Sequence, residues 1–247
     1  GTLKPDFSQV ALDVPQLAGN SRFALFLPEK RPFFFESADL LRTPTDALYT
    51  RTLTQPRAGL RATWRGPSLA ATVLAAGDLG GGTVLLPGPY GTDGVEQPAS
   101  QALIARATQR RDEHALGGLV AARRYADGRG VNAVLGPDLE TPLSRTWRVR
   151  AQWLGSHTTA QAVGGTLQAG EARHGHRGYL RLLRLDEDSE TSLTLDDIGR
   201  HFRHDTGFVF QSGTREWAAH QVWKWRPLGP FNQFELYTDV REVRDRR

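Results

Sequence analysis

The sequence predicts an all-β fold, an antiparallel meander of strands, and three observations support this class. From Gly59 onward, segments of about seven to eleven residues alternate between apolar and polar side chains and end in clusters of turn-forming residues. In the clearest segment, residues 147–153, every odd position is apolar and every even position is polar, the pattern of a strand with one dry face. No segment of about ten residues or more in this part of the chain has the periodicity of an amphipathic helix.

Composition restricts the class of protein further. The 247 residues suffice for one large domain or two modest ones with a sizeable core. No apolar run approaches the roughly 18 residues of a transmembrane helix, so a helical membrane protein is excluded. The absence of cysteine excludes disulfides, a thiolate nucleophile and Cys-ligated metal sites. The net charge of +4 is scattered along the chain, so we expect no nucleic-acid partner.

The order of elements follows from these patterns. Residues 1–58 are irregular and rich in proline and phenylalanine, and we expect them to form the first strands and a segment that folds inward. In residues 59–247 the alternation predicts a strand meander, with strands at 60–65, 68–76, 101–109, 113–125, 130–139, 147–153, 165–172, 178–185, 206–211, 216–225 and 233–241. Glycine and proline predict turns at 66–67, 127–128, 136–138, 155–156, 175, 212–213 and 227–230, and long loops are expected near 77–100 and 186–200.

So many strands must close into a barrel or stack into a sandwich, because open edges promote aggregation. The dry faces are rich in Ala, Gly, Leu and Trp, whereas a sandwich core is dense in Val, Ile and Phe. The wet faces carry long series of Arg, Gln, Thr and Glu, as a polar barrel lumen does. Aromatic residues also lie near strand ends, where the girdles of a membrane barrel occur: Trp64, Tyr125, Trp147, Trp153, Tyr179, Trp217, Trp223 and Trp225. On pattern alone, both a membrane barrel and a soluble sandwich stay open.

Four segments resemble a known bacterial family. Three are dense near the N-terminus: LKPDFSQVALD (3–13), RFALFLPEKRPFFFESADL (22–40) and ALYTRTL (47–53). The fourth, DDIGRHFRHDTGFVFQ (196–211), is similar to a later part of the family. Together they resemble the outer-membrane β-barrel region called domain of unknown function 5916, which follows a family 9 carbohydrate-binding-like domain.

The resemblance implies an antiparallel meander forming part of a transmembrane β-barrel in the bacterial outer membrane. Residues 1–247 would then form a single barrel region, an internal fragment of a longer chain. The implied partners are outer-membrane lipid and carbohydrate, and the expected function is recognition or passage of a ligand at the cell surface. Two alternatives stay open: a barrel-type hydrolase acting on extracellular or envelope polymers, and a soluble β-sandwich binding module.

The most unusual chemistry lies in residues 28–36, where four charged residues stand among phenylalanines and two prolines. Proline disfavours a regular helix or a central strand, and charges beside apolar rings require ion pairs or a wet cavity. We therefore expect an inward-folded element in the lumen whose charge network narrows a pore or binds a polar ligand. Its candidate residues are Asp6, Asp13, Glu29, Lys30, Arg31 and Glu36. The alternative is a structural plug whose ion pairs only fix the loop.

Motifs for other chemistry are missing. The pairs His174 with His176 and His201 with His204 lack a third ligand at a recognisable spacing, so no metal and no cofactor are expected. The sequence contains no Gly-x-Ser-x-Gly elbow, His-Glu-x-x-His motif or Gly-x-x-x-x-Gly-Lys loop. The acidic run at 186–190 is interpreted as a solvated extracellular loop and not as the carboxylate pair of a glycoside hydrolase. No catalytic residue is assigned, and the pattern favours a protein that is not an enzyme.

Overall fold

A computed structural model describes residues 2–3, 31–35, 38–226 and 228–246. Its strands are β1 (Thr2–Leu3), β2 (Pro56–Arg65), β3 (Leu69–Asp78), β4 (Thr83–Gly88), β5 (Gly91–Glu96), β6 (Ser100–Arg111), β7 (His114–Tyr125), β8 (Val131–Pro142), β9 (Trp147–Val163), β10 (Thr166–Leu185), β11 (Ser189–Ile198), β12 (Thr214–Trp225) and β13 (Phe234–Asp245). Three short helical segments, α1 (Pro32–Phe35), η1 (Ala38–Leu41) and η2 (Thr50–Thr52), precede β2.

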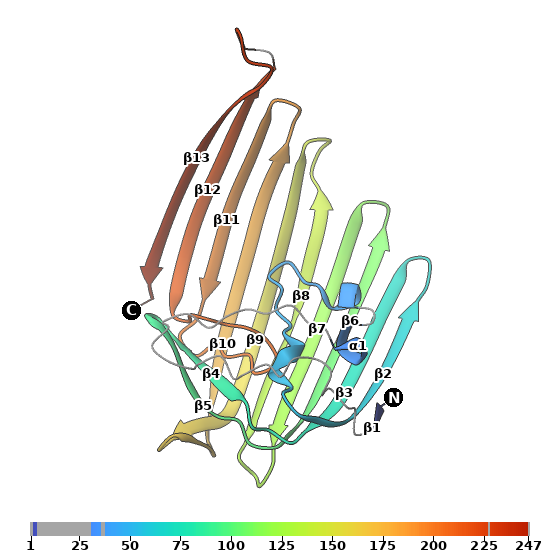
Figure 1. The fold of residues 1–247 in the computed structure, drawn as a ribbon, viewed down its shortest axis with the longest axis vertical. Helices are drawn as coiled ribbons and strands as arrows, with labels where there is room; N and C mark the ends of the chain where they lie inside the picture. The colour runs from blue at the N-terminus through green and yellow to red at the C-terminus, as the bar shows by residue number, and fades with distance from the viewer. Residues whose placement is uncertain (1, 4–30, 36–37, 227, 247) are drawn as a thin grey trace.

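The strands form one large antiparallel sheet, so the predicted all-β meander is confirmed (Figure 1). Its eleven strands follow the order β1-β2-β3-β6-β7-β8-β9-β10-β11-β12-β13. The hairpin β4–β5 forms a separate two-stranded sheet inserted between β3 and β6. Within the described residues the large sheet is open, with β1 and β13 at its two edges.

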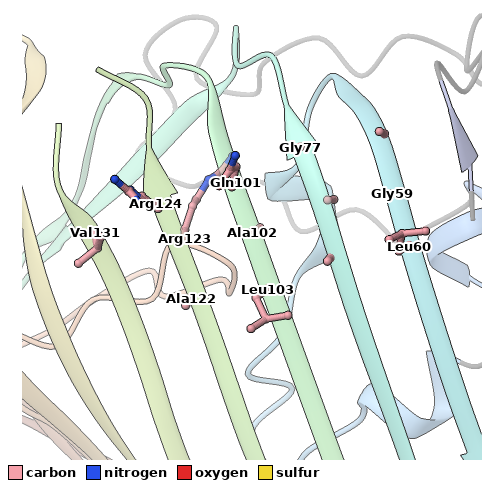
Figure 2. A pocket seen from close by; sticks show the side chains of 13 residues that line it. Gly59, Leu60, Gly77, Gln101, Ala102, Leu103, Ala122, Arg123, Arg124 and Val131 are labelled. Carbon is pink, nitrogen blue, oxygen red and sulfur yellow. The ribbon is translucent and has the colours of Figure 1, made fainter. Parts of the chain in front are cut away.

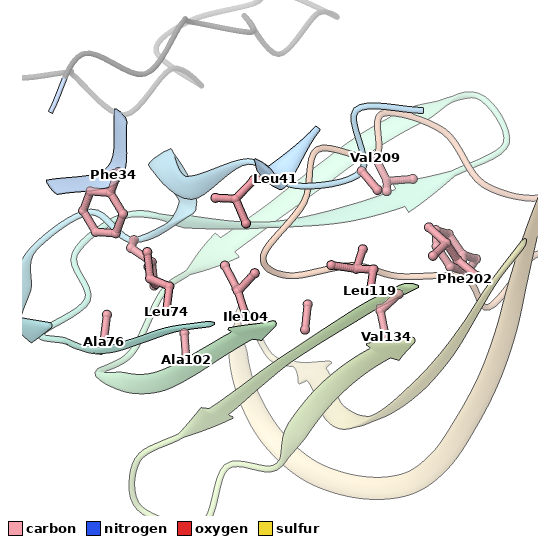
Figure 3. Packing of buried hydrophobic residues seen from close by; sticks show 14 residues of the cluster. Phe34, Leu41, Leu74, Ala76, Ala102, Ile104, Leu119, Val134, Phe202 and Val209 are labelled. Carbon is pink, nitrogen blue, oxygen red and sulfur yellow. The ribbon is translucent and has the colours of Figure 1, made fainter. Parts of the chain in front are cut away.

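One face of the large sheet, which we call the inner face, is covered by segments outside the sheet. They comprise residues 31–35 and 38–53, with the three helical segments, and the connection 199–213; we call them the plug. Figure 3 shows side chains of the plug above those of the strands. The buried core between them contains Leu74, Ile104, Leu119, Val134 and Leu154 from the strands and Phe34, Leu41, Leu53, Phe202 and Val209 from the plug.

Three of the predicted turns are wrong, because Gly136, Gly155 and Gly175 lie inside β8, β9 and β10. A Cβ at Gly136 would lie 1.8 Å from the carbonyl oxygen of Trp153, and one at Gly175 would lie 2.3 Å from the backbone nitrogen of Phe202. Glycine in a strand permits such close approach of another backbone. These residues therefore mark contacts across the sheet and with the plug, and the chain does not reverse at them.

Two other expectations also differ from the structure. The predicted long loop at 186–200 is wrong, because β11 pairs with β10 and β12 over most of that range and only a short turn at 186–188 precedes it. The predicted strand at 206–211 is wrong as well, since those residues belong to the plug. Near 77–100, the connection contains the hairpin β4–β5.

Candidate functional site

The inner face carries a buried arginine that links the large sheet, which we also call the wall, to the plug. Arg123 of β7 is 1% exposed, and its guanidinium lies 2.8 Å from the carboxylate of Asp78 in β3. It also donates hydrogen bonds to Ser100 Oγ (2.9 Å) and to the carbonyl oxygens of Thr52 (3.0 Å) and Asp205 (3.2 Å). Three strands and both parts of the plug therefore meet at one side chain.

The carboxylate of Asp78 has further donors of its own. It accepts hydrogen bonds from the backbone N–H groups of Gln55 (2.7 Å) and Thr54 (3.2 Å) and from Gln97 Nε2 (2.6 Å). A buried ion pair is tolerated when its remaining polar atoms are also bonded. This network therefore fixes the chain just before β2 against the wall at low electrostatic cost.

A second buried cluster lies in the connection 199–213. The carboxylate of Asp205 accepts two hydrogen bonds from the Arg203 guanidinium (2.6 and 2.7 Å) and one from the Tyr125 hydroxyl (2.7 Å). Burial by itself lowers the pKa of Arg203, but the charge and hydrogen bonds of Asp205 outweigh burial, and the pKa is raised. Asn132 of β8 accepts from the backbone N–H of Asp205 (2.8 Å) and donates to the carbonyl of Arg203 (3.0 Å). The cluster fastens this part of the plug to β7 and β8.

His204 lies beside this cluster and is neutral at pH 7. Burial lowers its pKa to about 4. Its Nε2 lies 3.1 Å from Thr206 Oγ1, and its Nδ1 has no hydrogen-bond partner within the described residues. Together with Asp205 these are the residue types of a hydrolase, but all three side chains are buried. The arrangement therefore serves the packing of the plug, since a substrate has no access to it.

The structure describes one of the six predicted site residues, Arg31. Its guanidinium donates to the carbonyl oxygens of Leu53 (2.5 Å) and Thr50 (2.9 Å) and lies 4.3 Å from the ring centroid of Phe34. Arg31 is buried and holds both ends of η2 within the plug. The other five, Asp6, Asp13, Glu29, Lys30 and Glu36, lie outside the described residues.

The opposite face of the large sheet, which we call the outer face, is apolar and exposed. Leu60 (70% exposed), Trp64 (65%) and Leu135 (57%) are typical of it. Further exposed side chains continue it from β3 to β13: Leu69, Val73, Leu103, Leu116, Val120, Leu139, Trp153, Leu180, Leu193, Trp217, Trp223, Leu236 and Val240. Such an extended apolar surface is unusual for a soluble monomer.

A depression of about 880 Å³ indents this outer face across β2, β3, β6 and β7 (Figure 2). Its lining combines the small residues Gly77 and Ala122 with the larger side chains of Leu60, Leu103 and Arg124. Small residues on neighbouring strands therefore leave an apolar hollow on the outer face.

The histidines considered as metal ligands have other contacts. The rings of His157 and His174 pack at 4.9 Å between centroids. His176 Nε2 lies 3.3 Å from a carboxylate oxygen of Asp197 and 2.8 Å from Arg246. Within the described ranges, no group of three or more His, Cys, Asp or Glu side chains is arranged to hold a metal ion. No described helix is long and apolar enough to span a membrane.

Comparison of the chain with protein-family models, curated proteins and solved structures gives no match. The resemblance to domain of unknown function 5916 therefore stays a prediction.

Sequence reasoning missed the buried network: Asp78, Arg123, Tyr125, Asn132, Arg203 and Asp205. One signal was present, because residues 201–208 mix charged residues with phenylalanines as residues 28–36 do. The same composition marks both parts of the plug.

Proposed function

We propose that this chain forms wall and plug of a bacterial outer-membrane β-barrel related to domain of unknown function 5916. Its outer face contacts lipid, and its inner side recognises or passes a polar ligand, with carbohydrate as the expected class. The observation that carries the proposal is the chemical difference between the two faces of the sheet. Large apolar side chains are exposed on the outer face, whereas arginine and aspartate side chains are buried on the inner face.

The outer face supports contact with lipid. In a transmembrane barrel, lipid-facing apolar residues alternate with polar residues that face the lumen. Along β8, for example, Leu135 and Leu139 are exposed on the outer face, while Asn132 and Asp138 are buried on the inner face. A soluble sandwich would require a second sheet over the outer face. The hairpin β4–β5 does not supply it, since its valines pack against inner-face residues such as Tyr125.

The inner face supports a barrel that is filled at this point and not widely open. The plug packs on β3, β6, β7, β8 and β9 through the apolar core, and hydrogen bonds join it to β7, β8 and β9. A barrel-type hydrolase would instead need an acid and a base that reach a substrate together. Within the described residues the closest approximation, His204 with its neighbours Asp205 and Thr206, is buried, so binding or passage is favoured over hydrolysis.

Fractionation of the source bacterium tests the proposal. The natural protein should stay in the outer-membrane fraction after carbonate and urea washes, and unboiled samples should migrate differently from boiled samples on an SDS gel. A soluble periplasmic protein and an integral outer-membrane protein serve as the two controls. Release into the wash together with the periplasmic control would overturn membrane insertion and favour the sandwich alternative.

A further inference from the structure

We propose that the inner face contains a binding site for the acidic group of a saccharide, formed by Arg148 and Arg150 of β9 and Arg181 of β10. The proposal rests on the proposed function, since it names the chemistry of the ligand that the inner side recognises. The chemistry that all candidate groups share is an oxyanion: a carboxylate, a sulfate or a phosphate.

The register of the strands places two arginines side by side. Arg150 lies directly opposite Arg181, and both belong to the inner face. Residues paired across neighbouring strands form a row on the inner face. The row of Arg150 and Arg181 continues to Glu140 in β8 and to Thr194 in β11. Like charges that lie directly opposite each other destabilise a sheet. A bound anion between the two guanidinium groups would remove that repulsion.

The carboxylates nearby do not balance these charges. Glu140 Oε1 accepts hydrogen bonds from both Arg150 (3.0 Å) and Arg148 (3.4 Å). Arg148 also reaches the exposed Glu113 at 3.2 Å. Arg181 has a hydroxyl as its partner, Ser192 Oγ at 2.8 Å, and it forms no ion pair with any described carboxylate. The row therefore carries excess positive charge around Arg181.

Donors without acceptors lie in the adjoining row. Gln152, two residues from Arg150 on the same face, is 4% exposed, and its Oε1 accepts a hydrogen bond from Thr45 Oγ1 of the plug (2.6 Å). Its Nε2 has no acceptor within the described part of the chain, and neither has Nε of Arg150. A buried donor left without an acceptor is unfavourable. Tyr179, opposite Gln152, makes no hydrogen bond to the described residues through its hydroxyl. An anion would supply acceptors where they are missing.

A ligand can reach the site from the rim of the sheet. A hollow of about 590 Å³ lies between the β6–β7 and β8–β9 turns, and its lining includes Arg148 and Leu183. These two residues lie opposite each other in the row next to Arg150 and Arg181. Arg148 therefore lies at the hollow, and Arg150 and Arg181 form the next pair on the inner face, one step closer to the plug.

The geometry selects the ligand class. Arginine binds carboxylate, sulfate and phosphate groups through paired N–H donors, and it is more weakly hydrated than lysine. A free inorganic ion would fill only the gap between two guanidinium groups. The hollow leaves room for a larger molecule attached to the anion, and we therefore assign the site to a uronic acid or a sulfated sugar at the end of an oligosaccharide.

Thermal unfolding and calorimetry on the natural protein in detergent test the site. The probes are sulfate, trigalacturonate and the neutral trisaccharide of galactose, with ionic strength matched by sodium chloride. We expect trigalacturonate and sulfate to bind and to raise the unfolding temperature by several degrees, and the neutral sugar to have no effect. Arg181→Gln should weaken both anions by about tenfold or more. The matched control, Arg124→Gln on the outer face, should bind as the unaltered protein does.

A second readout separates the site from a general loss of folding. Without anions and at low ionic strength, Arg181→Gln should unfold at the same temperature as the unaltered protein or a higher one, because the repulsion is gone. If Arg181→Gln does not fold, Arg150→Gln replaces it with the same expectation for binding. Binding of sulfate without trigalacturonate would overturn the saccharide assignment, and absence of both would overturn the site. Because binding is measured in detergent, it is independent of the membrane wash that tests the proposed function.

Discussion

Arg123 and Asp78 form an ion pair of 2.8 Å in which the two side chains are 1% and 0% exposed. The pair joins β7 to β3, and Arg123 extends it to the plug carbonyls of Thr52 and Asp205. A buried pair of this kind adds little stability compared with apolar residues of the same volume, but breaking it leaves an uncompensated charge. Its importance therefore lies in how strictly it fixes the plug on the wall.

Replacement of Arg123 by methionine should destabilise the protein by roughly 3–5 kcal/mol, because Asp78 then keeps a buried charge without its partner. The measurement is the urea midpoint of the purified protein, together with proteolysis of residues 38–53. Arg124→Met is the control and should be nearly neutral, since the Arg124 side chain is exposed on the outer face. An equal, small effect of both variants would show that the network does not hold the plug.

Leu135→Arg tests which solvent the outer face meets. Leu135 is 57% exposed and belongs to the middle of β8. In a bilayer an arginine near the midplane of the barrel wall costs about 2–4 kcal/mol, so we expect poor insertion and loss of the gel shift on boiling. Leu143→Arg is the control, because the Leu143 side chain is exposed to a similar extent (62%) but lies in the β8–β9 turn. If the outer face meets water instead of lipid, both variants would be harmless.

His204 should make the attachment of the plug sensitive to acid. Its pKa is about 4 in the folded protein and about 6.5 in an unfolded chain, so the unfolded state binds more protons between these values. The stability associated with the neutral ring is therefore complete above pH 6.5 and is lost as the pH falls through that window. At pH 4.5 the loss should reach about 2–3 kcal/mol.

Urea midpoints between pH 7.5 and pH 4.5 measure this effect. His204→Gln should flatten the dependence, whereas His201→Gln, at an exposed position of the same connection, should leave it unchanged. Comparing the two variants removes the contribution of carboxylates that titrate in the same range. Parallel profiles for all three proteins would contradict the assignment to His204.

The strands could be predicted where the outer face alone sets the pattern. Residues 147–153 alternate because their odd positions belong to the apolar outer face. Beyond them β9 continues to Val163, but the alternation disappears. There the inner face mixes the apolar core residues Leu154 and Ala160 with Thr158, which is hydrogen-bonded to Asn132. The outer face carries polar residues such as His157 and Gln161. The alternation of apolar and polar residues can be recognised in the sequence only where all residues on one face of the strand have the same character.

The plug could be predicted only in part. The mixture of charges and rings in residues 28–36 predicts an inward segment, and the one of its charged residues that the structure describes, Arg31, is buried. Residues 206–211 were predicted to be a strand because phenylalanine and valine alternate there with smaller or polar residues. What decides their place is long-range: Asn132 bonds the backbone of Asp205, and Tyr125 bonds its side chain. Contacts across more than 70 residues have no local sequence pattern.

Gly175 and Gly178 of β10 form a matched pair for testing whether backbone contact with the plug requires a glycine in the strand. A Cβ at Gly175 would lie 2.3 Å from the backbone nitrogen of Phe202, whereas one at Gly178 would meet nothing within 4 Å. Gly175→Ala must therefore displace the connection 199–213 and should cost about 1–3 kcal/mol, the range for overpacking. Gly178→Ala adds the same methyl group to the same strand, and it should be neutral or slightly stabilising because it restricts the unfolded chain.

The readouts are the urea midpoint and the rate at which a protease cleaves within residues 199–213. Faster cleavage in Gly175→Ala alone would mean that the glycine is required for the close approach of the plug, and that its place inside a strand follows from that contact. Equal cleavage and equal midpoints in both variants would mean that the connection moves away from β10 at little cost. In that case the attachment of the plug would depend on Arg203, Asp205 and Asn132, and not on backbone contact with the wall.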